Sequence, residues 1–281
     1  MPELPEVETV RRGLSPAMEG RVIERVELRR ADLRFPFPDD FVKRLEGSKI
    51  NRLGRRAKFL MGELSSGELL TMHLGMTGRF SIQGKGFEIF EHSAGDNPKH
   101  DHVVFHMQDE VTITFNDPRR FGFMELYKEG EAEASKRFSE LGPEPLSNHF
   151  SPEYLEQVLR GKSSPIKNTL LDQRIVAGLG NIYVCEALFR SGISPTRKSS
   201  TIKGKLAARL VPVIKDVIRE AIDAGGSSIS DFAQTDGKLG YFQHSFFVYG
   251  KEDEPCTTCA KPIERISQSG RSTFFCSSCQ K

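Results

Sequence analysis

The sequence predicts an α+β protein with two domains: a β-sandwich preceded by one helix, then a helical domain that ends in a metal-clipped β-hairpin. Three observations predict this fold. Apolar residues recur with a period of two between residues 21 and about 127, the period becomes helical from residue 151 onward, and four cysteines lie near the end of the chain. At 281 residues the chain is long enough for two domains that each bury a core.

The first predicted element is an amphipathic helix over residues 3–18. Leu4, Val7, Val10 and Leu14 recur every three or four positions, which places them on one buried face. Such a helix would hold the start of the chain in a fixed position.

Pro2 is a candidate nucleophile through its main-chain nitrogen. A small residue after Met1 favours removal of that methionine, which would leave Pro2 as a secondary amine. Model α-amino groups titrate near about pH 8, and an unprotonated amine can attack carbon to form an iminium. Glu3 lies beside it, and Glu6 follows on the same side of the helix. The alternative is an ordinary acidic helix start, because Pro and carboxylates both suit a first turn.

Runs of alternating or continuous apolar residues between 21 and 127 predict seven or eight strands, which favours a sandwich or a flattened barrel. Residues 131–149 begin with a helical pattern and then pass Gly142-Pro143-Glu144-Pro145, which is typical of a linker. Helices are predicted at 152–160, 165–172, 181–190 and 203–223. The predicted domains are therefore 1–130, a linker at 131–149, 150–246 and 247–281.

Four of the five cysteines form two Cys-x2-Cys pairs with sixteen residues between them: Cys256, Cys259, Cys276 and Cys279. In a cytosolic chain this spacing favours a tetrahedral zinc site over disulfides. Gly270 is predicted at the turn of a β-hairpin between the pairs. We expect one zinc ion per chain with a structural role, since four thiolates leave no open coordination position. Cys185, in an apolar helical pattern, is expected to be a buried thiol.

Charge and hydropathy exclude some classes of protein. No run of about 18 consecutive apolar residues exists, so no transmembrane helix is expected. The acidic N-terminus is unlike a signal peptide, and we expect a cytoplasmic protein. Residues 1–160 hold 23 Lys/Arg against 27 Asp/Glu, whereas residues 161–281 hold 17 against 11. The basic second part hints at a polyanion partner, although a merely basic surface would have the same composition.

Four short motifs in the predicted β-domain are candidates for a functional role. Arg119, Arg120 and Phe121 lie in a turn after a strand, which is typical of a tip that enters a partner. Met76, in a glycine-rich turn, is more often a core residue than a probe. Lys58 lies in a basic strand that could simply be solvated. His100-Asp101-His102 would put two imidazoles on one strand face, but no further ligand spacing supports a second metal.

Two motifs in the second part of the chain are also candidates for a functional role. Gly178-Leu179-Gly180-Asn181 precedes a predicted helix, where Asn181 can cap the helix or its exposed amides can bind phosphate. Arg271 follows Gly270 in the predicted hairpin, where a turn would project its side chain outward.

Together these motifs resemble those of the bacterial formamidopyrimidine-DNA glycosylases, of the helix–two-turn–helix class, over essentially the whole chain. The motifs that carry the resemblance, in chain order, are Pro2-Glu3-Leu4-Pro5-Glu6, Arg55-Arg56-Ala57-Lys58, His73-Leu74-Gly75-Met76-Thr77-Gly78, Lys99-His100-Asp101-His102, Asp117-Pro118-Arg119-Arg120-Phe121-Gly122, Gly180-Asn181-Ile182-Tyr183 and the four cysteines. The resemblance implies that the first helix is catalytic and that the helical domain is of the helix–two-turn–helix type. Asp231-Phe232 through Gly240-Tyr241-Phe242 resembles the loop that folds over an extruded 8-oxoguanine.

The resemblance also implies an activity and its residues. The protein would remove oxidised purines from damaged double-stranded DNA in base-excision repair and then cleave the strand by β,δ-elimination. Catalytic roles would fall to Pro2, Glu3, Lys58 and Arg271. DNA-binding roles would fall to His100, Arg119, Lys162, Lys167, Asn181, Met76 and Phe121. We expect a monomer that associates with the nucleoid through DNA.

Two alternatives remain. The related endonuclease VIII branch prefers oxidised pyrimidines, and Leu4 argues against it because that branch usually has Gly at this position. A non-enzymatic DNA-damage-binding zinc protein would need none of Pro2, Glu3, Lys58 or Arg271, and all four are present.

Overall fold

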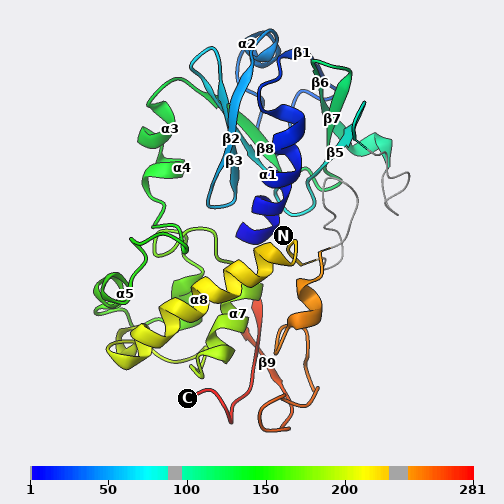
Figure 1. Cartoon of the computed structure of the whole chain (residues 1–281). Helices are drawn as coiled ribbons and strands as arrows, with labels where there is room; N and C mark the ends of the chain where they lie inside the picture. Colours follow the sequence, from blue (N-terminus) through cyan, green and yellow to red (C-terminus); the bar gives the residue numbers. More distant parts are fainter. Residues whose placement is uncertain (1, 88–96, 228–239) are drawn as a thin grey trace. The chain divides into compact units, whose positions relative to one another are not determined.

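The computed structural model describes residues 2–87, 97–227 and 240–281 (Figure 1). The chain divides into two compact units. The first comprises Met1–Ser139 with Ala224–Gln243, and the second comprises Glu140–Asp223 with His244–Lys281. The predicted domain limits stay a prediction.

The first unit is a sandwich of two antiparallel four-stranded sheets, ordered β1-β6-β7-β5 and β2-β3-β4-β8 (Figure 1). Its strands are β1 (Ile23–Leu28), β2 (Ile50–Arg56), β3 (Phe59–Leu64), β4 (Leu69–His73), β5 (Arg79–Gln83), β6 (Asp101–Met107), β7 (Val111–Asn116) and β8 (Phe123–Tyr127). The predicted β-sandwich is confirmed. The chain changes sheet between β1 and β2, between β4 and β5, and between β7 and β8.

Helix α1 (Leu4–Met18) packs against the sandwich, chiefly on β2. The four residues of its predicted apolar stripe, Leu4, Val7, Val10 and Leu14, are each at most 1% exposed. Full burial of such a side chain contributes roughly 1.5–3 kcal/mol, so the stripe fixes the helix and with it the residues at its N-terminus. The predicted helix over residues 3–18 is confirmed. The shorter helices of this unit are α2 (Phe41–Leu45), η1 (Pro98–His100), α3 (Glu131–Ala134) and α4 (Lys136–Ser139).

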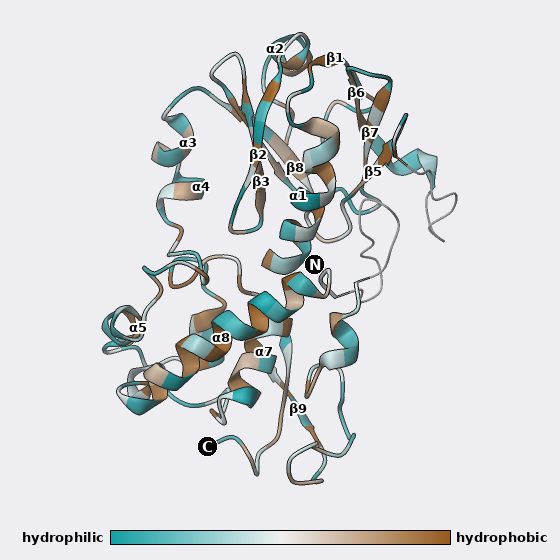
Figure 2. Cartoon of the chain, viewed as in Figure 1, coloured by the Kyte–Doolittle hydropathy of each residue, from teal (hydrophilic) through white to brown (hydrophobic). Residues whose placement is uncertain are grey.

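The second unit is helical and ends in a β-hairpin. Its main helices are α5 (Pro152–Leu159), α6 (Ile166–Leu170), α7 (Asn181–Arg190) and α8 (Lys205–Asp223), with a short η2 (Ser199–Thr201). The last helix is amphipathic: Figure 2 shows both brown and teal residues along α8, and its buried residues include Leu210, Ile214 and Ile218. A one-turn helix, η3 (Phe242–Ser245), precedes the hairpin strands β9 (Glu264–Gln268) and β10 (Arg271–Phe275). The predicted helices and hairpin are confirmed.

In the described part of the chain, no helix is long and apolar enough to cross a bilayer.

Candidate active site and nucleic-acid interface

The residues at the start of α1 are buried, although they include two carboxylates. Pro2 is buried, and Glu3 and Glu6 are only 3% and 2% exposed. The Glu3 backbone N–H donates to Glu6 Oε2 at 2.8 Å, which completes a capping box at the helix N-terminus. This arrangement fixes the backbone of Glu3, and with it the position of the residue before it.

The other oxygen of Glu6 holds a distant segment in place. Ser227 donates to Glu6 Oε1 through both its backbone N–H and its Oγ, each at 2.9 Å. Ser227 also forms an antiparallel bridge with Tyr241. The predicted lesion loop from Asp231 to Phe242 falls largely on residues 228–239, which lie outside the described residues.

Lys58 lies in the two-residue turn between β2 and β3 and is only 7% exposed. The interpretation of Lys58 as a solvated strand residue is therefore wrong. The preceding residue, Ala57, adopts a left-handed backbone with a φ of 52°. A non-glycine residue in this region is uncommon and is held there by its surroundings, as is typical of functional turns.

His73, at the end of β4, lies in an aromatic and cationic environment. Its ring stacks on Phe123 with a centroid distance of 5.0 Å, and its Nδ1 accepts a hydrogen bond from the Gly75 backbone N–H at 3.0 Å. Burial, followed by the positive charges of Lys58, Arg137 and Arg34, lowers the pKa of His73 from 6.5 to about 4. The imidazole is therefore neutral at physiological pH, in agreement with Nδ1 acting as an acceptor.

Three of the predicted DNA-binding residues are exposed on two turns of the first unit. Met76 is 37% exposed in the β4–β5 turn, and Phe121 is 39% exposed in the β7–β8 turn. Arg119 is exposed, and its guanidinium carbon lies 4.8 Å from the centre of the Phe121 ring. The interpretation of Met76 as a core residue is wrong, because its side chain is exposed.

The histidine pair predicted on one strand is not on one strand. His100 ends η1, and only His102 lies in β6. His102 is buried and its Nε2 lies 2.9 Å from the carbonyl oxygen of Asp117. Within residues 2–87, 97–227 and 240–281, the four hairpin cysteines are the only cluster that could hold a metal ion. The His100 carbonyl oxygen accepts from Asp117 N at 3.0 Å, which places His100 beside the Arg119 turn.

In the second unit, Arg271 is the first residue of β10 and is exposed. Ser269 and Gly270 both have positive φ, 49° and 73°, so they form a tight hairpin turn that projects the next side chain outward, as predicted. Lys162 lies between α5 and α6 and is partly exposed.

Lys167 and Asn181 both bond to the hairpin strand. Lys167 is 0% exposed and donates to Thr273 Oγ1 at 2.8 Å and to the Ser272 carbonyl at 3.2 Å. Asn181 Nδ2 donates to the same Ser272 carbonyl at 2.8 Å. The interpretation of Asn181 as a helix cap is wrong, because Gly180 occupies the N-cap position of α7. Both side chains hold the backbone next to Arg271.

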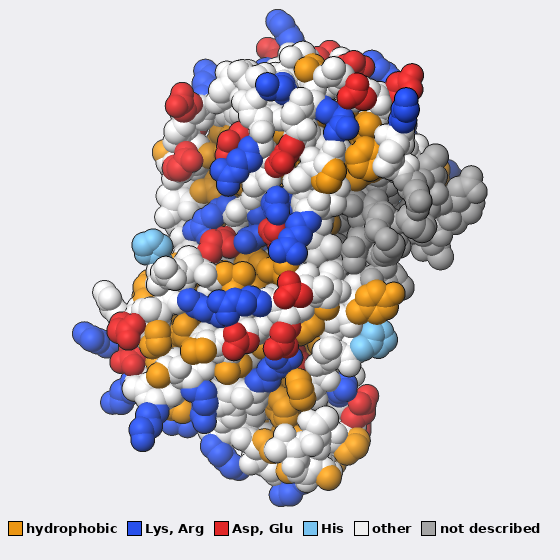
Figure 3. All heavy atoms as spheres, viewed as in Figure 1, with side chains coloured by type: hydrophobic (Ala, Val, Ile, Leu, Met, Phe, Trp, Pro, Cys, Tyr) orange, Lys and Arg blue, Asp and Glu red, His pale blue; other side chains and the backbone are white. Residues whose placement is uncertain are grey.

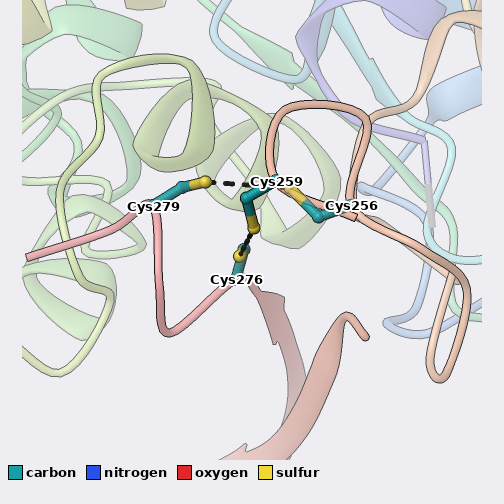
Figure 4. A group of neighbouring side chains, drawn as sticks. All are labelled: Cys256, Cys259, Cys276 and Cys279. Carbon is teal, nitrogen blue, oxygen red and sulfur yellow. Dashed lines mark hydrogen bonds between the residues drawn. The ribbon is translucent and has the colours of Figure 1, made fainter. Parts of the chain in front are cut away.

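The four predicted metal ligands converge at the base of the hairpin (Figure 4). All four sulfur atoms lie within 4.8 Å of one another, with 3.8 Å between Cys256 and Cys279 and 3.5 Å between Cys259 and Cys276. A tetrahedral Zn–S bond of about 2.3 Å requires sulfurs about 3.8 Å apart, so the cluster fits one structural zinc ion. Cys185 is 1% exposed and belongs to the apolar cluster beneath this site, as predicted.

Basic and acidic side chains are interspersed on the face drawn in Figure 3. Its charge is therefore not one uniform basic patch. Binding of a polyanion would depend on particular arginines and lysines rather than on net charge alone.

Several residues with a structural part in these sites escaped prediction. Asp117 lies in a quoted motif, and an Asp before Pro in a turn is a signal for side-chain to backbone bonding. Asp117 accepts a hydrogen bond from Thr77, and Glu186 accepts one from Val248, before the hairpin. Neither bond has a local sequence signal, because the two partners are far apart in the chain.

Three family models match consecutive parts of the chain. They are the formamidopyrimidine-DNA glycosylase N-terminal domain at residues 1–124, the formamidopyrimidine-DNA glycosylase H2TH domain at 141–233, and the zinc finger found in FPG and IleRS at 253–281. The last match contains the four clustered cysteines.

Individual relatives agree with these matches. A formamidopyrimidine-DNA glycosylase of Ruegeria pomeroyi is 57% identical over 283 residues and covers 100% of both chains. A Lactococcus lactis Fpg bound to DNA with an abasic site has a TM-score of 0.87 and 33% identity, with 100% of both chains covered. A MutM bound to DNA that contains carbocyclic 8-oxo-G has the same TM-score, identity and coverage.

Proposed function

The chain belongs to the formamidopyrimidine-DNA glycosylase family, and from this premise we propose that it removes oxidised purines from duplex DNA through its N-terminal proline and then cleaves the strand. The observation that carries the mechanism is the start of α1, where Pro2 and Glu3 are buried and Glu3 is held by the capping box with Glu6. An amine fixed beside a carboxylate suits attack on carbon with proton transfer at the same centre.

Once Met1 is removed, the Pro2 nitrogen forms a bond to the sugar C1′ while the glycosidic bond breaks, and the base leaves with a proton. Glu3 then donates a proton to O4′ as the C1′–O4′ bond breaks, which opens the sugar ring and leaves an iminium between the Pro2 nitrogen and C1′. The resulting iminium withdraws electrons, so a proton is lost from C2′ and the 3′ phosphate leaves by β-elimination. A second elimination releases the 5′ phosphate, and water then hydrolyses the iminium and frees Pro2.

Two cations serve the later steps. Lys58, buried in its turn, would exchange protons near the sugar. Burial is the main cause that lowers the pKa of His73, and the positive charge of Lys58 lowers it further. Arg271, exposed at the hairpin turn, would stabilise the negative charge of the phosphate that leaves in the δ step. Zinc acts through structure alone, since it orders the hairpin that carries Arg271.

The remaining predicted residues would hold and open the DNA. Met76, Arg119 and Phe121 fill the gap left by the extruded base, which explains why apolar side chains are exposed on two turns. His100, Lys162 and Asn181 contact phosphates. Lys167 stays a predicted DNA contact, but its full burial favours an indirect part through the hairpin. We further propose that the protein acts as a monomer and associates with the nucleoid through DNA.

Borohydride trapping tests the nucleophile. Reduction during turnover should link the protein to damaged DNA, with the crosslink at residue 2 and Met1 absent by intact mass. An N-terminal extension that is not cleaved converts the amine of Pro2 to an amide, so trapping and excision should both be lost while DNA binding remains. Trapping that survives this extension but disappears in Lys58→Ala would assign the nucleophile to Lys58 instead.

The same preparation separates the substrate alternatives. Excision should be faster from duplexes with 8-oxo-G opposite C than from matched duplexes with an oxidised pyrimidine. The opposite order would favour endonuclease VIII-like specificity, and binding without excision of either base would favour a damage-binding protein.

A further inference from the structure

The two turns that carry the proposed gap-filling residues leave the sandwich side by side. His73, at the end of β4, pairs with Phe123 at the start of β8 in one sheet. Arg79, at the start of β5, pairs with Asn116 at the end of β7 in the other sheet. The β4–β5 and β7–β8 turns are therefore neighbouring crossovers between the same two sheets.

One buried side chain bonds to both turns. Asp117 is 0% exposed, and its Oδ1 accepts from Thr77 Oγ1 at 2.5 Å and from the Arg119 backbone N–H at 3.3 Å. Its Oδ2 accepts from the Gly122 backbone N–H at 2.8 Å. Thr77 Oγ1 also accepts from the Arg119 N–H at 3.3 Å. The carboxylate thus spans its own turn and reaches the residue next to Met76.

The backbone of Asp117 is fixed as well. Its N–H donates to the His100 carbonyl at 3.0 Å, and its carbonyl oxygen accepts from His102 Nε2 at 2.9 Å and from the Arg120 N–H at 3.2 Å. These backbone hydrogen bonds hold the Asp117 carboxylate in one position between the two turns.

The backbones of the two turns are in direct contact. A Cβ added to Gly75 would lie 2.3 Å from the carbonyl carbon of Phe121 and 2.4 Å from the nitrogen of Gly122. Gly75 also has a φ of 64°, so only glycine fits this approach without strain. The contact holds the backbone beside Met76 against the backbone of Phe121.

We propose that Asp117 and Thr77 are positioning residues that join the two turns into one rigid tip, so that Met76, Arg119 and Phe121 enter the duplex as a unit. The inference rests on the proposed function and adds the means by which the gap-fillers are held. Opening a base pair costs free energy, and side chains ordered before contact with DNA lose little further entropy on insertion.

The test compares Thr77→Val with Thr77→Ser, since valine keeps the shape and serine keeps the hydroxyl. Single-turnover base excision is measured on a duplex with 8-oxo-G opposite C, and strand cleavage is measured on the same duplex with a preformed abasic site. Fluorescence of 2-aminopurine beside the lesion follows base-pair opening. Thr77→Ala provides a second, smaller replacement if valine disturbs folding.

Thr77→Val should slow base-pair opening and excision about tenfold, as loss of one charge-assisted hydrogen bond predicts, and change abasic-site cleavage by less than about twofold. Thr77→Ser should retain both rates within about twofold. In an Arg119→Ala background, Thr77→Val should add little further loss, because both act on the same insertion step.

Parent-like excision rates in both Thr77→Val and Thr77→Ala would overturn the inference. So would a Thr77→Val variant that loses base excision and abasic-site cleavage equally, or a Thr77→Ser variant that excises much more slowly than the parent. These outcomes leave the parent protein active and the proposed function intact. A parent protein that neither excises 8-oxo-G nor cleaves the abasic site would instead overturn the proposed function and this inference with it.

Discussion

Arg55 bonds to Glu8 on α1: its Nε lies 3.2 Å from Glu8 Oε2, and its Nη1 donates to the Ala57 carbonyl oxygen at 2.8 Å. Both side chains are nearly buried, at 11% and 13% exposure. Burial by itself raises the pKa of Glu8, but hydrogen bonds and charge from Arg11 and Arg55 lower it below its ordinary value of 4.5. One guanidinium therefore links the helix that carries Pro2 with the turn that carries Lys58.

Replacement of Arg55 should affect the chemistry more than DNA binding. In Arg55→Ala, α1 and the Ala57–Lys58 turn lose their shared anchor, and small displacements of reacting groups are costly. We expect strand cleavage at an abasic site to slow about tenfold. Arg52→Ala is the matched control, because Arg52 lies on the same strand, has a side chain that is 69% exposed and forms an exposed ion pair with Glu63 at 3.5 Å. Equal rates in the two variants would contradict the prediction.

Glu186 on α7 is a second buried anchor. It is 0% exposed and accepts from the backbone N–H groups of Phe247, Val248 and Tyr249 at 2.9, 3.0 and 2.9 Å. In Glu186→Gln, the side-chain NH2 would face backbone N–H groups that need an acceptor, and the negative charge would be lost. We therefore expect the free energy of unfolding, measured by urea denaturation, to fall by about 3 kcal/mol.

The control for Glu186 is Glu220→Gln. Glu220 has an ion pair with Arg190 at 2.6 Å but is 52% exposed, and exposed pairs contribute about 0–1 kcal/mol. Hydrogen exchange should show faster exchange at residues 247–249 in Glu186→Gln alone. Similar stability of the two variants would show that the three N–H groups do not depend on this carboxylate.

Zinc removal should unfold the hairpin and spare the sandwich. The apolar cluster beside the cysteines, which includes Val248 and Ile263, is small, so we expect the hairpin to need the metal to stay folded. Chelation or Cys256→Ser should increase hydrogen exchange over residues 247–281 and weaken DNA binding, with little change in the strands of the sandwich. Cys185→Ser is the control, because Cys185 is buried but lies outside the ligand set. Elemental analysis should give one zinc in the parent and in Cys185→Ser, and a protein purified without zinc would refute the assignment.

Much of the fold could be predicted because its signals are local. The stripe of Leu4, Val7, Val10 and Leu14 predicted α1, and the Cys-x2-Cys pairs predicted the hairpin with Arg271 at its turn. The pairing of β4 with β8 and of β5 with β7 had no such signal, since strand partners that are far apart in sequence are chosen by packing of the whole sandwich.

The residues of the candidate site could be predicted from the sequence, but their burial and hydrogen-bond partners could not. Charged residues are rarely fully buried without partners, so burial of Lys167 and its bond to Thr273 could not be expected from the sequence. Asn181 is a good capping residue by type, yet Gly180 takes that position and leaves the Asn181 amide to bond to Ser272. Such partners, about a hundred residues away in the chain, become visible only in the folded structure.

The depressed pKa of His73 makes stability depend on pH. The folded chain keeps His73 neutral down to about pH 4, whereas the unfolded chain takes up a proton near the ordinary value of 6.5. Protons therefore bind preferentially to the unfolded state between these values, so this contribution to stability is complete above pH 6.5 and is lost as the pH falls toward 4. We expect a loss on the order of 3 kcal/mol across the window.

His73→Asn isolates this effect from the carboxylates that titrate in the same range. The Asn Oδ1 can take the place of Nδ1 as acceptor for the Gly75 N–H, while the side chain no longer takes up a proton. The free energy of unfolding of the two proteins, measured by urea denaturation at pH 7.5, 6.5, 5.5 and about 4.5, should fall more steeply in the parent than in His73→Asn. Parallel curves would show that His73 binds its proton equally well in both states, and that the positive charges around it do not act on the imidazole.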